Sequence, residues 1–343
     1  MTKKIMTVCG AINSEDLGIT LPHEHILIDL RSSWKGFPDS DKNNGIFKER
    51  IKLSNRGKVV YNTFNFIENM YHLNINDAIK ELNEFKEIGG CSVVDVTSCG
   101  LGRDPKMLYK VSKKTGLNIL MGAGNYASFV WTDEMKKRSI EDIKNEILND
   151  FENGVTELKI KPGVIGEVGI WHFKNELEIK SLIGAAKAQK IINCAFFIHP
   201  PIWETFGNNI LDILEKEKVN LNKVVLCHCD PTLDNYDYHD SLAKRGAFIE
   251  YDLWGSEFMS YEGWFLPSDG DRIKAVKEQI KRGNLNRILF SHDACFKISF
   301  KKWGGFGYTH IIENIIPRLK QAGISDEQIN QIIIENPKNL LSF

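Results

Sequence analysis

Eight short, mostly apolar runs, separated by segments with helical spacing, constrain the fold of this chain more than any other feature. Continuously apolar strands are typical of a parallel sheet that is buried on both faces. Most of the runs precede a predicted helix, so the chain reads as repeated βα units. Eight such units predict a closed (β/α)8 TIM barrel, an α/β fold. The predicted strands cover residues 21–29, 91–97, 118–122, 163–169, 192–199, 224–228, 247–252 and 287–293.

Helical periodicity and capping signals separate these strands. The capping-box-like pair Ser139 and Asp142 begins one helix, and Gly154 ends it. An open doubly wound sheet is the alternative, but no Gly-x-Gly-x-x-Gly motif follows the first strand, so its dinucleotide-binding version has no support. The predicted helices cover about residues 76–88, 105–114, 139–153, 176–190, 210–218, 238–245, 271–282, 308–321 and 326–334.

The chain of 343 residues is long enough for one large domain or two small ones. No composition shift, internal repeat or low-complexity segment marks a boundary, so we expect a single domain over residues 1–343. A short hairpin is predicted within residues 4–20. Residues 31–65 are a long polar stretch, and we expect them to form an active-site loop among long loops at the C-terminal face of the barrel.

Charge and cysteine content limit the partners and the compartment. Forty-four basic and 45 acidic residues give a net charge of −1, which does not suggest a nucleic-acid or membrane partner. The start of the chain lacks the apolar core of a signal peptide, and no apolar run approaches the length of a membrane span. Seven cysteines, mostly in apolar runs, indicate reduced thiols in a cytoplasmic protein. Cys227 and Cys229 flank His228, but without a second cysteine pair they read as buried thiols rather than metal ligands.

Two histidines in the first predicted strand provide the first functional signal. His23 and His25 are two residues apart, and side chains at this spacing on a strand point to the same face. Two imidazoles on one face make half of a metal site. The pattern alone is a weak signal for a metal site, so its interpretation depends on the residues of the other strands.

Four further strands carry metal-binding side chains at or near their C-terminal ends, where the catalytic residues of a (β/α)8 barrel lie. Imidazole and carboxylate together suit Zn²⁺, Mn²⁺, Co²⁺, Fe²⁺ or Ni²⁺. With the two histidines above, the set has six members, more than one catalytic zinc uses. Two metals that share a bridging carboxylate and a bridging hydroxide fit better, and such a pair supports hydrolysis. The four side chains are Glu167, His199, His228 and Asp293.

Motifs along nearly the whole chain resemble the phosphotriesterase-related branch of the amidohydrolase superfamily, which includes phosphotriesterases and related lactonases. Gly-Ile-Thr-Leu-Pro-His-Glu-His stands at residues 18–25, and Gly-Val-Ile-Gly-Glu-Val-Gly stands at residues 163–169. Shorter motifs are found at 197–200, 227–230, 288–293, 303–310 and 335–341. The resemblance implies a (β/α)8 hydrolase with two divalent ions, and we expect Zn²⁺ and a homodimer.

The resemblance also implies a role for each ligand. His23 and His25 with Asp293 would hold the more buried metal, and His199 with His228 would hold the more exposed one. Asp293 would in addition accept a proton from the attacking water.

The bridging ligand has three candidates. In true phosphotriesterases and related lactonases it is a carboxylated lysine, but Glu167 is the strand-four residue that best matches the related branch. A glutamate bridges without modification. Lys159 and Lys161 are the competing candidates, and we expect both to lie before the functional end of the strand.

Contacts to the substrate are predicted from position alone. Tyr126, after the third strand, is placed to line the mouth of the site. Arg103, after the second, could meet an anionic substrate or form a salt bridge with Asp104 or Asp95. True phosphotriesterases have a histidine after the strand-seven aspartate, whereas here Leu253 follows Asp252. This departure argues against efficient organophosphate hydrolysis.

We therefore predict a binuclear metal-dependent hydrolase whose bridging hydroxide attacks the carbonyl of a small lactone, ester or amide, which could bear an anionic group such as phosphate. A phosphotriester hydrolase and a non-catalytic metal-binding barrel are the alternatives.

Overall fold

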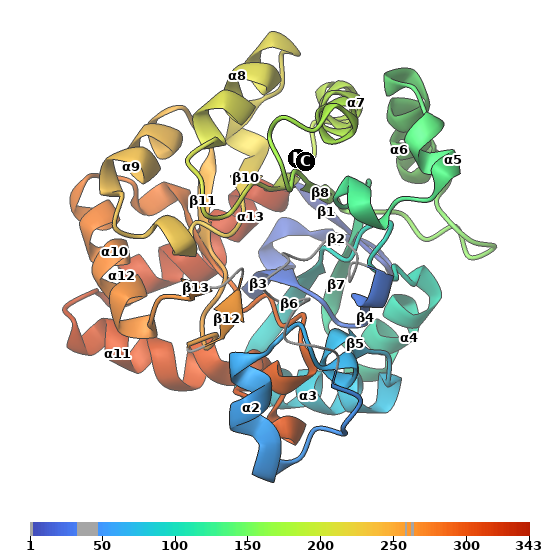
Figure 1. The fold of residues 1–343 in the computed structure, drawn as a ribbon. Coiled ribbons are helices and arrows are strands. Elements are labelled where there is room, and N and C mark those ends of the chain that lie inside the picture. Colours follow the sequence, from blue (N-terminus) through green and yellow to red (C-terminus); the bar gives the residue numbers. More distant parts are fainter. Residues whose placement is uncertain (1–2, 33–46, 258, 262–263) are drawn as a thin grey trace.

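The computed structural model describes residues 3–32, 47–257, 259–261 and 264–343, and its centre is a barrel of parallel strands surrounded by helices (Figure 1). Within these residues, eight strands form one sheet in the order β14-β11-β10-β9-β8-β7-β6-β3, and every pairing in it is parallel. The strands are β3 (Ile19–Glu24), β6 (Gly90–Asp95), β7 (Asn118–Ala123), β8 (Val164–Gly169), β9 (Phe196–His199), β10 (Val224–Leu226), β11 (Phe248–Tyr251) and β14 (Ile288–Phe290).

Contacts between the first and last strands bring the sheet close to full closure. The N–H of His23 on β3 donates to Oγ of Ser291 at 3.0 Å, just past the end of β14. The N–H of Asp293 donates to the carbonyl oxygen of His23 at 3.3 Å. The (β/α)8 barrel predicted from the sequence is thereby confirmed.

Helices cover the outside of the barrel, and their ends follow the capping signals. Ser139 Oγ accepts from the N–H of Asp142, whose carboxylate accepts from the N–H of Ser139, so α6 begins with the predicted capping box. The helices between strands are α3 (Ile75–Glu87), α4 (Pro105–Thr115), α5 (Asp133–Lys137), α6 (Ile140–Asn153), α7 (Glu176–Ile192), α8 (Gly207–Lys216), α9 (Tyr236–Lys244) and α10 (Asp269–Lys281). None of the helices in the described ranges is long and apolar enough to cross a membrane.

The two predicted C-terminal helices are each interrupted by a π-helical segment. Ile311–Ile315 precedes α11 (Ile316–Gln321), while Gln331–Glu335 separates α12 (Asp326–Asn330) from α13 (Asn336–Leu341). A proline, Pro317 or Pro337, stands in the first turn after each π segment. Proline has no N–H to donate, so the regular helical ladder cannot continue through it.

Apolar side chains fill the lower part of the barrel, and both ends of the chain close its base. Ile5 of the hairpin β1 (Lys4–Thr7) and β2 (Gly10–Asn13) packs there with Leu340 and Leu341 of α13. The base of the barrel is therefore filled with packed side chains. The polar site lies at the opposite end, past the C-terminal ends of the strands. The residues inside the barrel include Val94, Val96, Leu120, Val164, Phe197, Val225, Phe248 and Leu289.

Some boundaries differ from the predictions. The strand predicted over 192–199 begins only at Phe196, because α7 continues to Ile192 and Asn193 caps it in the left-handed conformation with φ of 56°. The stretch 31–65, predicted as a loop, contains α2 (Arg56–Tyr61). Its residues 33–46 lie outside the described part of the chain, so the active-site-loop prediction for them stays a prediction.

Candidate metal centre

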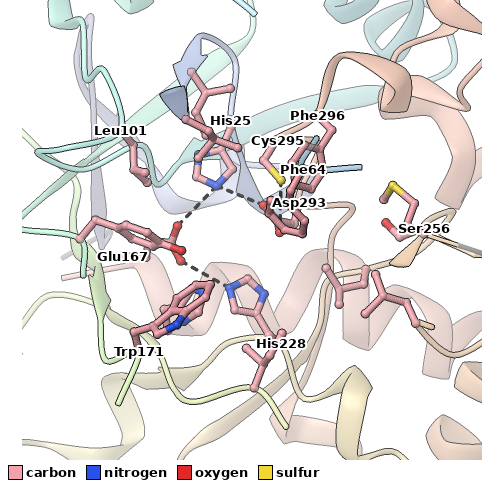
Figure 2. A pocket seen from close by; sticks show the side chains of 18 of the residues that line it. His25, Phe64, Leu101, Glu167, Trp171, His228, Ser256, Asp293, Cys295 and Phe296 are labelled. Carbon is pink, nitrogen blue, oxygen red and sulfur yellow. Dashed lines mark hydrogen bonds and ion pairs between the residues drawn. The ribbon is translucent and has the colours of Figure 1, made fainter. Parts of the chain in front are cut away.

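Six side chains predicted from the sequence converge above the apolar core, and Figure 2 shows four of them from close by. They come from strands that are distant in the sequence, and all are buried except Asp293, which is partly exposed. His228 and Asp293 lie just past β10 and β14, with φ of 52° and 47°, so the chain turns sharply as it leaves each strand. The six are His23, His25, Glu167, His199, His228 and Asp293.

Each histidine is held through its Nδ1 atom. Nδ1 of His23 lies 3.0 Å from Oε2 of Glu250, and Nδ1 of His25 lies 2.8 Å from Oγ1 of Thr97. Because a ring nitrogen that donates to an acceptor fixes the tautomer, His23 presents the lone pair of Nε2 to the site.

The other two histidines follow the same rule. Nδ1 of His199 lies 3.0 Å from the carbonyl oxygen of Pro200, and Nδ1 of His228 lies 2.9 Å from Oδ1 of Asp252. Both donations leave Nε2 free to bind a metal. Metal-binding histidines in proteins are usually supported in this way.

The Nε2 atoms of His25 and His228 approach the acidic side chains Glu167 and Asp293 (Figure 2). Nε2 of His25 lies 3.1 Å from Asp293 Oδ1 and 3.5 Å from Glu167 Oε1. Nε2 of His228 lies 3.4 Å from Glu167 Oε2. Glu167 thus lies between histidines from opposite sides of the site, as a bridging ligand must.

Two buried atoms of the site have no hydrogen-bond partner, namely His23 Nε2 and Glu167 Oε2. Leaving such atoms unpaired in the interior is costly, and a divalent cation between them would satisfy both. Donor atoms of His23, His25 and Glu167 lie within 4.8 Å of one another, as do those of Glu167, His199 and His228. Glu167 belongs to both groups, so the residues fit two adjacent metal ions of the nitrogen- and oxygen-binding type.

The electrostatics of the site favour an ionised Glu167 beside the histidines. Burial raises the pKa of Glu167, but His228, whose Nε2 lies 3.4 Å away, and the other nearby histidines bring it well below its usual range. Burial lowers the pKa of His23, but Asp252, Glu250 and Glu167 together raise it to about 10. Burial, reinforced by His228, lowers the pKa of His199 to about 3. The Glu167 carboxylate therefore carries negative charge that a bound cation would neutralise.

A mostly apolar cavity opens above the six side chains (Figure 2). Its volume, including the part open to solvent, is about 710 Å³, which suits a small-molecule substrate. One wall is aromatic: Trp171 stacks on the ring of His199 at 5.8 Å, and Tyr126 meets the same ring edge-on at 5.3 Å. None of its lining residues, all from the described part of the chain, is a lysine or arginine.

Three sequence candidates lie away from this cavity. Arg103 forms an ion pair with Asp150 at 2.8 Å and does not line the cavity, so its guanidinium is engaged elsewhere. Lys159 and Lys161 precede β8 and do not line the cavity either. Of the three candidates for the bridging position, the structure brings only Glu167 to the histidines.

Sequence reasoning missed the supporting carboxylates Glu250 and Asp252. Both are fully buried, and both contact the Nδ1 side of His23, at 3.0 Å and 3.4 Å. Glu250 on β11 and Asp252 just past its end have the same spacing as His23 on β3 and His25 just past its end, so alternate acidic residues at the end of an apolar strand were the available signal.

Comparison with known proteins decides the family. The family model described as "Phosphotriesterase family" matches residues 3–341. This chain belongs to the phosphotriesterase family. The resemblance seen in the sequence is thereby confirmed. The family consists of binuclear metal hydrolases, and the cluster of histidine, glutamate and aspartate side chains could hold such metals.

Individual members of the family are similar over their whole length. An N-acetyltaurine hydrolase from Dictyostelium discoideum is 36% identical, and the match covers 99% of this chain and 98% of that protein. The crystal structure of a resiniferatoxin-binding protein from Rhodobacter sphaeroides has a TM-score of 0.93 and 33% identity, covering 98% of this chain and 94% of that one. The lactonase Lmo2620 from Listeria monocytogenes shares the fold, with a TM-score of 0.81, 22% identity and 99% coverage of each chain. The chain is a hydrolase.

Proposed function

We propose that this phosphotriesterase-family protein is a metal-dependent hydrolase that cleaves the acyl–nitrogen bond of a small N-acyl amine. The observation that carries the metal dependence is the convergence of four histidine Nε2 atoms on Glu167, where two buried atoms, His23 Nε2 and Glu167 Oε2, have no hydrogen-bond partner. Support for an amide substrate comes from relatives named N-acetyltaurine hydrolase, which match this chain from end to end.

We assign the ligands to two positions. His23, His25 and Asp293 would hold the inner metal, His199 and His228 would hold the outer one, and Glu167 would bridge them. Two divalent ions, when bound, would lower the pKa of a shared water and polarise the substrate carbonyl. Zn²⁺ is the metal we would test first, because imidazole and carboxylate ligands suit it.

The chain's own residues supply the rest of the chemistry. The carboxylate of Asp293 is the most exposed of the six and lines the cavity, so it can accept a proton from water and pass it to the leaving nitrogen. Glu250, Thr97 and Asp252 hold the histidine rings in the orientation that metal binding needs. The apolar walls limit access of bulk water and strengthen these electrostatic contacts.

The proposal is tested with the purified protein, loaded with Zn²⁺ and assayed against N-acetyltaurine, other N-acetyl amino compounds, esters and lactones. In water enriched in ¹⁸O, we expect one ¹⁸O atom in the released carboxylate. Asp293→Asn should lower kcat by at least a factor of about 100. Its metal content is measured in parallel, to separate loss of chemistry from loss of metal.

Two results would overturn the proposal. One is a protein that takes up no divalent metal under any condition. The other is a protein that takes up metal and hydrolyses esters or lactones but no N-acyl amine. The protein would then still be a metal-dependent hydrolase, but of a different substrate class.

A further inference from the structure

One carboxylate, that of Asp252, contacts two of the metal-binding histidines. Its Oδ1 lies 2.9 Å from Nδ1 of His228, and its Oδ2 lies 3.4 Å from Nδ1 of His23. Under the proposed function, on which this inference rests, these histidines belong to different metal positions. We propose that Asp252 is a positioning residue that supports one ligand of each metal, so that a single side chain controls the affinity of both.

The position of Asp252 is itself fixed from several sides. Its carboxylate is fully buried, and Oδ2 also accepts the backbone N–H of His228 at 2.9 Å. Its own N–H donates to Oδ2 of Asp230 at 3.0 Å, and Asp230 is ion-paired with the buried Arg272. The carboxylate therefore cannot rotate towards one histidine without losing contacts to the other.

Glu250, two residues earlier and within β11, contacts a ligand of one metal position only. Its Oε2 lies 3.0 Å from Nδ1 of His23, and this is its single hydrogen bond to the candidate ligands in the described structure. Glu250 and Asp252 thus differ in a measurable way: the first supports one ligand, and the second supports two.

The other two histidines provide internal controls. His25 is supported by Thr97 Oγ1, and His199 by the carbonyl oxygen of Pro200. Neither support passes through Asp252. A change at Thr97 should therefore affect only the position that His25 serves.

The substitution Asp252→Asn shows what the carboxylate supplies. Asparagine has nearly the same volume but one acceptor oxygen in place of two, and its NH₂ group would face an Nδ1–H donor. Loss of the partner that orients a metal-binding histidine typically lowers metal affinity about 10- to 100-fold. Because Asp252 meets a ligand of each position, we expect this loss at both.

The experiment measures two Zn²⁺ dissociation constants by competition with a chromophoric chelator, in the absence of substrate. D252N should weaken both constants about 10- to 100-fold. E250Q and the control T97V should each weaken one constant and leave the other within about 3-fold of wild type. The melting temperature of each metal-free variant is recorded, because a general loss of structure would lower it as well.

The inference is overturned if D252N retains wild-type affinity for either ion, or if E250Q weakens the binding of both ions equally. The E250Q comparison keeps the inference open to refutation even where D252N does not fold, because equal weakening of both constants would overturn it. Failure of the proposed function looks different: the dissociation constants would shift as expected, but the wild-type protein would release no amine from any N-acyl compound.

Discussion

Arg272 on α10 is the deepest cation in the described part of the chain, and replacing it with methionine should destabilise the protein strongly. Its side chain is fully buried. The guanidinium pairs with Asp230 and with Asp269, and Nη1 also donates to the carbonyl oxygen of Pro267 at 2.8 Å. Methionine fills much of the same space but leaves these acceptors without their cation.

The free-energy cost of this substitution arises mainly at Asp230. Asp269 keeps the N–H of Gly255 at 3.0 Å and Nε2 of His310 at 2.7 Å, whereas Asp230 keeps only the N–H of Asp252 among the described residues. Removing one partner of a buried ion pair typically costs about 3–5 kcal/mol. We expect R272M to lose this much free energy of unfolding at pH 8.

The dependence on pH provides a second signature. Burial already raises the pKa of Asp230 to about 6, against the lowering effect of Arg272. Without the arginine this pKa rises further, while in the unfolded chain it stays near its ordinary value of about 4. The folded state then binds a proton that the unfolded chain has released, so the stability lost in R272M should grow as pH rises from about 6 to 8.

Urea unfolding followed by tryptophan fluorescence measures the effect. With a slope of about 3 kcal/mol per molar urea, the expected loss lowers the midpoint by about 1–1.7 M. The double variant R272M/D230N removes both charges and should recover most of the loss. A midpoint within about 0.3 M of wild type, or no recovery in the double variant, would refute the reasoning.

Three further outcomes are expected. Leu340→Ala at the base of the barrel should cost about 2–5 kcal/mol in urea unfolding, because Leu340 is fully buried there. Calorimetry with and without chelator should show a lower melting temperature without metal, since each ion held at about 1,000 times its Kd contributes about 4 kcal/mol. Burial lowers the pKa of His239 to about 4, so stability should fall as pH drops from about 6.5 towards 4, and His239→Gln should reduce that slope in pH-dependent unfolding.

The barrel could be predicted because each strand is apolar on both faces and a helix follows most strands. The convergence of the candidate ligands could be predicted because a (β/α)8 barrel brings the C-terminal ends of its strands together, whatever their distance in the sequence. His23 and Asp293 are 270 residues apart by number, yet the N–H of Asp293 donates to the carbonyl oxygen of His23. The strand-end rule alone predicts that such residues meet.

The supports behind the ligands could not be predicted in the same way. Whether Glu250 points to His23 depends on the register between β11 and its neighbours, and a one-residue shift would turn the side chain to the other face. Arg103 shows the reverse case. It follows a strand end, as a substrate-binding residue would, but Asp150 on α6 takes its guanidinium, and helix packing rather than local sequence sets that contact.

The stacking of Trp171 on His199 gives the protein an intrinsic optical reporter. The indole and imidazole rings are 5.8 Å apart and inclined by 26°, and the indole also lines the cavity. A paramagnetic ion such as Co²⁺ held by His199 would quench the emission of this tryptophan far more than that of tryptophans remote from the site. Metal binding at the outer position and binding of a substrate could therefore be followed in real time by tryptophan fluorescence. The variant Trp171→Phe, which lacks this signal, is the control.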